Sequence, residues 1–139
     1  MNPDTRPENI LIVDDEEGVR MFERRILEDN RYSVIEAVNG VEAIALIDQG
    51  VPVDLVIADL DMPEMDGAEM ARRLFAGHPD LKVLFVTGNI GSLMNKRTLR
   101  TQEAFLEKPF TPAGLLEAVS QLLYDNLERS RPVGAPSCP

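Results

Sequence analysis

The chain has 139 residues, a length typical of one domain, and its 44% hydrophobic content is enough for a buried core. Its 14 Lys and Arg residues stand against 24 Asp and Glu residues, so the formal net charge at pH 7 is -10. Such an acidic surface repels nucleic-acid phosphates and anionic membranes, so we expect direct binding to neither. Metal ions and basic protein surfaces are the natural counterparts of this charge.

The chain has one cysteine, Cys138, and one histidine, His78. A single cysteine excludes an intramolecular disulfide and a cysteine-based metal cluster, and it is compatible with a reducing compartment. His78 stands in Gly-His-Pro-Asp, so we expect an exposed turn residue and not a zinc ligand. No apolar run approaches the roughly 20 residues of a membrane-spanning helix, and residues 1–9 do not resemble a signal peptide. We therefore expect a cytoplasmic protein.

Five short apolar runs, each followed by a segment with helical spacing, predict a parallel β-sheet covered by helices. The predicted strands are Ile10–Val13, Ser33–Ala37, Val53–Ala58, Lys82–Val86 and Ala104–Glu107. The third is apolar apart from Asp54, which is typical of a central strand buried on both faces. The expected fold class is α/β, a single doubly wound (βα)5 domain.

The segments between these strands predict the covering helices. The first runs from Glu17 to about Asp29, with an apolar stripe of Val19, Phe22, Ile26 and Leu27. The second is capped by Asn39, ends at Gly50 and carries Val41, Ile44, Ala45 and Ile47. The third runs from Gly67 to about Ala76.

Residues 91–101 predict a short, polar helix that we expect to be the least stable and to be mobile. The last helix begins with Thr111 and Pro112, and its buried stripe consists of Leu115, Leu116, Val119, Leu122 and Leu123. We expect residues 1–8 to be an N-terminal extension and residues 9–128 to be the folded domain. Residues 129–139 contain three prolines, a glycine and no hydrophobic run, which is typical of a disordered tail.

Polar residues follow the apolar runs where a parallel α/β sheet binds its ligands, outside the carboxyl ends of the strands. They are Asp14 and Asp15, Asp59, Thr87 with Gly88, and Lys108 with Pro109. Each alone could be a cap or turn residue. Together, three carboxylates would repel one another unless they share a cation. With oxygen ligands and no His or Cys available, the expected cation is Mg²⁺.

A carboxylate beside Mg²⁺, a hydroxyl and an ammonium group indicates phosphoryl chemistry. An aspartate can act as the nucleophile and form an acyl phosphate, while the positive charges stabilise the transferring group. Asp59 is the best candidate nucleophile because it ends the central strand alone. Asp14 and Asp15 form a pair better suited to holding the metal or its waters.

Four separated motifs resemble those of response-regulator receiver domains. They are LIVDDE at 11–16, DLDMP at 59–63 with DG at 66–67, VTG at 86–88, and FLEKPF at 105–110. The resemblance covers about residues 8–125, and the motifs occur in the family's order. It implies a flavodoxin-like five-stranded parallel sheet in the order 2-1-3-4-5. It also implies Mg²⁺-dependent transfer of a phosphoryl group from a kinase phosphohistidine to Asp59.

The resemblance assigns roles in metal binding and phosphorylation to individual residues. Asp14, Asp15 and Asp59 would bind Mg²⁺ together with the backbone carbonyl of Asp61. Thr87 and Lys108 would contact the phosphoryl group, which makes Asp59, Thr87 and Lys108 the catalytic set.

The resemblance also assigns a switch and two tuning positions. Thr87 would move inward on phosphorylation, and Phe105 would follow it as the switch aromatic, acting by packing because it lacks a tyrosine hydroxyl. The Lys108–Pro109 peptide bond is expected to be cis. The side chains of Asp61 and Asn89 would influence dephosphorylation in a direction that the residues leave open.

The implied phosphate donor is a sensor histidine kinase or a histidine phosphotransfer protein. The implied downstream partner is a protein that binds the face formed by the fourth helix, the fifth strand and the last helix. The last two helices are also candidates for a homodimer interface. Such a domain is not an enzyme in the ordinary sense, because it catalyses only its own phosphorylation and slow dephosphorylation.

Other functions remain open at this point. Asp59-Leu60-Asp61 also fits the Asp-x-Asp core of haloacid-dehalogenase-like phosphatases, although that core normally follows the first strand. A flavin or nucleotide module has the same topology, but residues 14–17 are all acidic and would repel a phosphate. A receiver that acts only as a scaffold would not need Asp59, Thr87 and Lys108. The sequence also leaves open whether the domain is free-standing, part of a hybrid kinase or a fragment of a longer regulator.

Overall fold

The structure, a computed structural model, describes residues 7–88 and 102–124. Its strands are β1 (Asn9–Val13), β2 (Ser33–Ala37), β3 (Leu55–Asp59), β4 (Lys82–Thr87) and β5 (Glu103–Glu107). Its helices are α1 (Glu17–Asp29), α2 (Gly40–Asp48), α3 (Gly67–Gly77) and α5 (Pro112–Tyr124). The helix predicted for 91–101, the tail predicted for 129–139 and most of the N-terminal extension lie outside the described residues. Within the described ranges, no helix combines the length and apolar character needed to cross a membrane.

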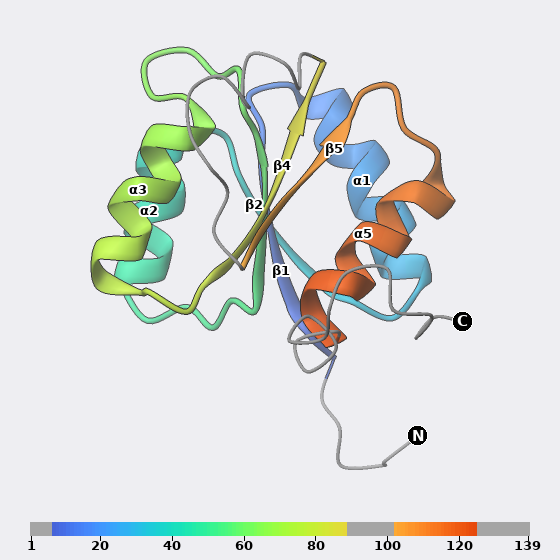
Figure 1. Ribbon diagram of the computed structural model, residues 1–139, viewed down its shortest axis with the longest axis horizontal. Coiled ribbons are helices and arrows are strands. Elements are labelled where there is room, and N and C mark those ends of the chain that lie inside the picture. The colour runs from blue at the N-terminus through green and yellow to red at the C-terminus, as the bar shows by residue number, and fades with distance from the viewer. Residues whose placement is uncertain (1–6, 89–101, 125–139) are drawn as a thin grey trace, which may run out of the picture.

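The strands form one sheet in the order β2-β1-β3-β4-β5, and every neighbouring pair is parallel. Helices α1 and α5 cover one face, and α2 and α3 cover the other (Figure 1). The predicted α/β class and strand order are therefore confirmed. All five residues of β3 are buried, as expected of a central strand between two helical layers.

Two apolar cores lie on the two faces of the sheet because successive strand residues point to opposite sides. On the α2 and α3 side the strands contribute Leu11, Val13, Val56, Ala58, Val83 and Phe85. On the α1 and α5 side they contribute Ile10, Ile12, Leu55, Ile57, Leu84 and Val86. The predicted stripe of the last helix joins this second core, with Leu115, Val119 and Leu122 buried and Leu116 and Leu123 partly buried.

The predicted stripe of α1 is wrong in one position. Ile26 and Leu27 are buried, but Phe22 is 47% exposed, and its ring lies 6.0 Å, centroid to centroid, from that of Phe110. Glu23 takes the neighbouring buried position instead, at 2% exposure. Residue 23 lies three and four positions before Ile26 and Leu27, so it shares their side of the helix.

The predicted stripe of α2 is wrong in a similar way. Val41 is 58% exposed and Ala45 is also exposed, whereas Ala43 and Ile47 are buried against the sheet. The pair at 43 and 47 is spaced by four residues and therefore shares one face, from which Val41 and Ala45 are rotated away.

The central strand begins two residues later than predicted. Asp54 lies before β3 and is tied to the start of β1: its backbone N–H donates to the Asn9 carbonyl at 2.8 Å, and its Oδ2 accepts from the Asn9 N–H at 2.7 Å. At the other end, Asp59 still belongs to the strand and is in register with Val86. The candidate nucleophile is thus the last residue of the buried central strand.

The predicted caps are confirmed at two helices. Asn39 accepts a hydrogen bond from the Glu42 N–H at 2.7 Å at the start of α2, and Thr111 Oγ1 accepts one from the Gly114 N–H at 3.0 Å at the start of α5. His78 follows α3, as expected of a turn residue. It is only partly exposed, because its Nε2 lies 3.1 Å from Asp48 Oδ1.

Candidate functional site

The carboxyl ends of three adjacent strands bring polar side chains to one edge of the sheet. Asp14 follows β1 directly, whereas Asp59 and Thr87 are the last residues of β3 and β4. Their exposed fractions are 2%, 7% and 0%, respectively. The apolar residues before them fix these strand ends within the core, so the polar side chains are held in place by the sheet itself.

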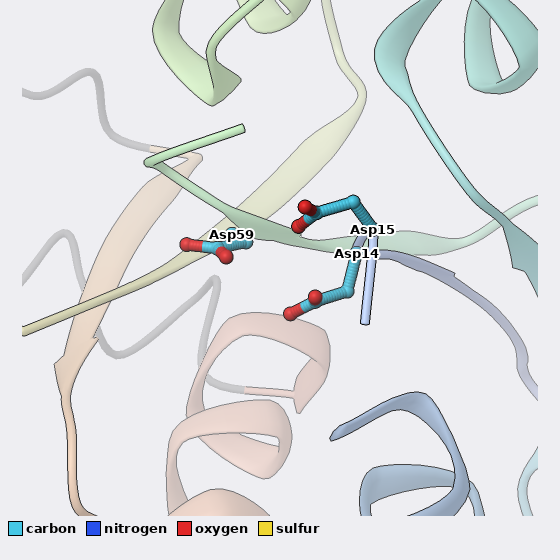
Figure 2. Close-up of side chains that lie close together, drawn as sticks. All are labelled: Asp14, Asp15 and Asp59. Carbon is cyan, nitrogen blue, oxygen red and sulfur yellow. The ribbon is translucent and has the colours of Figure 1, made fainter. Parts of the chain in front are cut away.

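Three carboxylates gather at this edge. Asp14, Asp15 and Asp59 each offer an oxygen that lies within 4.8 Å of the other two (Figure 2). Asp14 and Asp59 are buried, and Asp15 is exposed at the surface. Clustered oxygen donors suit a hard divalent cation such as Mg²⁺, which keeps several of its waters when it binds proteins. The donor set therefore fits the predicted metal, and the role of these residues as ligands stays a prediction.

Burial and mutual repulsion disfavour the ionised forms of the two buried carboxyl groups, Asp14 and Asp59. The pKa of Asp14 is raised to about 6: burial is the largest cause and the charges of Asp59 and Asp15 add to it, while the hydrogen bond from the Glu16 N–H and the charge of Lys108 oppose the rise. Burial also raises the pKa of Asp59, against a hydrogen bond from the Asp61 N–H and the charge of Lys108. A divalent cation among these oxygens would offset both the burial and the repulsion.

Lys108 supplies positive charge on the β5 side of Asp59. Its Nζ lies 3.6 Å from Asp59 Oδ2, and its backbone N–H donates to the Thr87 carbonyl at 2.8 Å. The Lys108–Pro109 peptide bond is cis, which confirms the prediction. Lys108 is therefore attached to the end of β4 by its backbone while its side chain reaches toward the end of β3.

Thr87 and Asp61 contact each other beside Asp59. The Thr87 hydroxyl donates to Asp61 Oδ2 over 3.4 Å, and the Asp61 N–H donates to Asp59 Oδ1 at 3.0 Å. The Asp61 carboxylate is not one of the three clustered carboxylates; the prediction for this residue concerned its backbone carbonyl. Phe105 is partly buried in β5 in register with Phe85 and packs against the α2 and α3 core. Asn89 lies outside the described residues.

Two residues to which the sequence assigned no role, Asp66 and Gly67, start α3 close to the end of β3. Asp66 caps α3 by accepting from the Glu69 N–H at 2.8 Å. A Cβ on Gly67 would lie 2.7 Å from the carbonyl oxygen of Asp59 and 3.0 Å from Leu60 Cα. A glycine is therefore needed for the helix to begin against the acceptor strand, and the Asp-Gly pair at 66–67 was the available signal.

Glu23 is a further residue that the sequence analysis missed. The pKa of its carboxyl is raised to about 8: burial is the largest cause, the charges of Asp14 and Asp59 add to it, and that of Lys108 opposes them. Its place in α1 therefore puts a further buried carboxyl, besides those of Asp14 and Asp59, under the influence of the cluster. The spacing of the apolar residues in the first helix gave no sign of this.

A separate cavity of ≈ 560 Å³ lies at the other end of the sheet, where the strands begin. Its lining includes Glu8, Asp54 and Lys82, and none of the predicted site residues. The predicted site residues therefore lie at the opposite edge of the sheet from this cavity.

Comparison with known proteins identifies the family. The family model of the response regulator receiver domain matches residues 10–120. This chain belongs to that family. The receiver domain is 39% identical to the sensor kinase CckA of Brucella abortus over 116 residues, which are 82% of this chain and 12% of that protein. It is 36% identical over 115 residues to the response regulator receiver protein CpdR of the same organism, covering 82% of this chain and 95% of CpdR.

The fold of the receiver domain agrees with solved structures. A crystal structure of a response regulator receiver protein from Sinorhizobium medicae matches it with a TM-score of 0.74 and 30% identity, covering 84% of this chain and 94% of that one. The domain is therefore a receiver of a two-component system. This membership sets aside the phosphatase and nucleotide-binding alternatives.

Proposed function

We propose that this receiver domain accepts a phosphoryl group on Asp59 from the phosphohistidine of a sensor histidine kinase or a histidine phosphotransfer protein. The observation that carries the proposal is the position of Asp59. It ends the buried central strand, shares a carboxylate cluster with Asp14 and Asp15, and has Lys108 Nζ 3.6 Å from its Oδ2. An acceptor needs this combination of a fixed nucleophile and nearby positive charge.

The transfer is a displacement at phosphorus. A carboxylate oxygen of Asp59 attacks the phosphorus atom, and the phosphorus–nitrogen bond of the phosphohistidine breaks. The imidazole nitrogen keeps the electron pair of that bond and takes up a proton from water. The products are an acyl phosphate on Asp59 and an unmodified histidine on the donor. The domain is consumed in each transfer until it is dephosphorylated, so we do not regard it as an enzyme that turns over an external substrate.

The surrounding residues bind and orient the transferring group. Bound Mg²⁺ would supply positive charge to its oxygens. Asp14, Asp15 and Asp59 would hold this cation together with the backbone carbonyl of Asp61. Once the acyl phosphate has formed, the phosphoryl group would extend from the Asp59 carboxylate that Lys108 contacts. The ammonium group would then bind an oxygen of the phosphoryl group in place of that carboxylate.

The output would depend on Thr87 and Phe105. The long hydrogen bond from Thr87 to Asp61 is weak, and a charged phosphoryl oxygen is the stronger acceptor. Thr87 would therefore move inward on phosphorylation. Because β4 and β5 are paired, with Phe85 beside Phe105, this shift would change the packing of Phe105 and the predicted output face, of which the structure describes β5 and α5. A downstream protein would bind that face.

The proposed donors are supported by the relatives. One is a sensor kinase and another is a response regulator receiver protein, and this chain resembles a segment of the first and nearly all of the second. A cytoplasmic location and a homodimer through the last two helices remain parts of the same proposal.

Incubation with a small acyl phosphate and Mg²⁺, followed by intact-mass measurement, tests the proposal. Wild type should gain the mass of one phosphoryl group, and Asp59→Asn should gain none. Asp54→Asn is the matched control, because Asp54 is an exposed aspartate before the same strand, and it should behave like wild type. A wild-type protein that stays unmodified would instead act only as a scaffold.

A further inference from the structure

Arg20 connects the acidic loop, residues 14–16 after β1, to β2, an edge strand of the sheet. It lies in the first turns of α1, and its side chain is only 12% exposed. Its Nη1 donates to the backbone carbonyl of Asp14 at 2.7 Å, and its Nε donates to Glu36 Oε1 in β2 at 2.8 Å. Two different nitrogens of one planar guanidinium thus donate hydrogen bonds to two different partners. This fixes the orientation of the side chain, which the single nitrogen of a lysine could not do.

Three hydrogen bonds hold Asp14 in place. Its backbone N–H donates to the Ala37 carbonyl at 3.2 Å, its Oδ1 accepts from the Glu16 N–H at 2.8 Å, and its carbonyl accepts from Arg20. The Arg20 bond is the only one of these three that comes from a side chain, and it acts on the peptide that joins Asp14 to Asp15. The orientation of both carboxylates depends on that peptide.

The positive charge of Arg20 is already matched by Glu36. The other oxygen of Glu36 accepts from Arg24 Nη1 at 2.6 Å, and hydrogen bonds from Arg24 and Arg20 lower the pKa of Glu36, so it stays ionised. Arg24 also contacts Glu28, at 3.0 Å, and within the part of the chain that the structure describes it makes no hydrogen bond or ion pair with Asp14. The two arginines therefore share a partner on β2 but differ in their relation to the acidic loop.

We propose that Arg20 is a positioning residue for the cation site, holding the Asp14–Asp15 peptide so that both carboxylates face Asp59. This inference rests on the proposed function, because it assumes that the three carboxylates bind Mg²⁺. It adds a residue that contacts neither the cation nor the phosphoryl group and acts through the backbone of a ligand.

The direction of the change in Mg²⁺ affinity when Arg20 is replaced distinguishes a positioning role from a purely electrostatic one. If Arg20 acted only as a nearby positive charge, its removal would strengthen the attraction of the acidic cluster for a cation. If Arg20 positions the ligands, its removal lets the peptide reorient and weakens binding. Removing a group that orients a metal ligand typically costs 10–100-fold in affinity, so we expect the dissociation constant of Arg20→Gln to rise about tenfold.

The experiment is a Mg²⁺ titration of the full chain, followed by backbone amide NMR shifts, for wild type and three variants. Arg24→Gln is the matched control, because it removes the same charge from the same helix without touching Asp14, and its affinity should stay within about twofold of wild type. Arg20→Lys keeps the charge but not the planar fork, so its affinity should lie between those of wild type and Arg20→Gln. Thermal unfolding without Mg²⁺ shows that each variant is folded.

A second readout is the rate of Asp59 phosphorylation as a function of Mg²⁺ concentration. Arg20→Gln should need more Mg²⁺ than wild type but should approach the wild-type rate at saturation, whereas general damage to the fold would lower the rate at every concentration. Unchanged or tighter Mg²⁺ binding by folded Arg20→Gln overturns the inference and leaves the proposed function intact. If Arg20→Gln does not fold, wild-type affinity in Arg20→Lys overturns it. A wild-type protein that binds no Mg²⁺ and is not phosphorylated overturns the proposed function itself.

Discussion

The ammonium group of Lys108 lies 3.6 Å from Asp59 Oδ2, although Asp59 ends β3, Lys108 follows β5, and β4 lies between these two strands. The side chain of Lys108 thus crosses the end of β4, where Thr87 is buried, to reach the acceptor. The contact brings together the proposed nucleophile, its counter-charge and the proposed switch residue. It is also the contact that phosphorylation would change first.

Replacing Lys108 with alanine should weaken binding of beryllofluoride, an analogue of the phosphoryl group. A hydrogen bond to a charged group is worth about 1.5–3 kcal/mol, so we expect a loss of affinity of at least about tenfold. At saturation, the amide shifts of Thr87 and Phe105 should remain close to those of the free protein, because the link between the strands is lost. Lys82→Ala is the control, since Lys82 is at the other end of β4 and contacts the Leu123 carbonyl. Equal beryllofluoride affinity in wild type and Lys108→Ala would refute the assigned role.

Replacing Gly67 with alanine should disturb the acceptor strand. The added Cβ would meet the backbone of Asp59 and Leu60, which cannot move aside as a flexible side chain could. We expect a loss of about 1–3 kcal/mol in the free energy of unfolding, measured in urea, and slower phosphorylation of Asp59. Gly77→Ala at the other end of α3 is the control, because a Cβ there meets nothing within 4 Å. A Gly67→Ala protein as stable as Gly77→Ala would show that the close approach is not required.

Replacing Arg31 with glycine should stabilise the domain. Arg31 follows the end of α1 with φ 73°, and the bond from the Tyr32 N–H to the Leu27 carbonyl closes the helix there. A left-handed residue other than glycine costs roughly 1–2 kcal/mol, so the unfolding free energy should rise by up to about 1 kcal/mol after the entropy cost of glycine. Arg25→Gly, inside the same helix, should lower stability by about 1 kcal/mol. If both variants lose stability equally, the backbone at Arg31 is not strained.

Glu23 should make stability fall as the pH rises in metal-free buffer. The pKa of its carboxyl is about 8 in the folded domain against an ordinary 4.5, so the folded state binds this proton more tightly between those values. That advantage is fully present below the ordinary pKa and is lost as the pH rises through the folded one. Relative to Glu23→Gln, wild type should lose on the order of 2 kcal/mol of unfolding free energy from about pH 6 to about pH 8. Parallel urea curves for the two proteins across this range would mean that the Glu23 carboxyl is not perturbed.

The strands and their ligand-binding edge could be predicted because they depend on local signals. Apolar runs that end in Asp14, Asp59 and Thr87 mark both the sheet and its carboxyl edge, and no residue far along the chain is needed to recognise them. The family resemblance then supplied the strand order, which local spacing could not. The cap residues Asn39 and Thr111 were recognisable for the same local reason.

The remaining features depend on contacts between distant segments. The sequence does not distinguish Arg20 from the other arginines of the first helix, which are all expected to be exposed. Only the pairing of β1 with β2 brings Glu36 within reach of Arg20. Glu23 shares the buried side of α1 with Ile26 and Leu27, whereas Phe22, for which burial was expected, lies beside Phe110, a residue far along the chain. The strand β3 begins at Leu55 and not at the predicted Val53. Asp54, just before it, is hydrogen-bonded to Asn9, and this contact exists only once the sheet has folded.

The most direct test of the central claim is to locate the phosphoryl group after transfer from a phosphorylated histidine protein in the presence of Mg²⁺. Borohydride reduction converts an aspartyl phosphate to homoserine, and peptide mass spectrometry then reports the position without any mutation. The account predicts homoserine at position 59 and at no other aspartate. Homoserine at Asp14 or Asp15, or none in a chain that has demonstrably received phosphate, would contradict it.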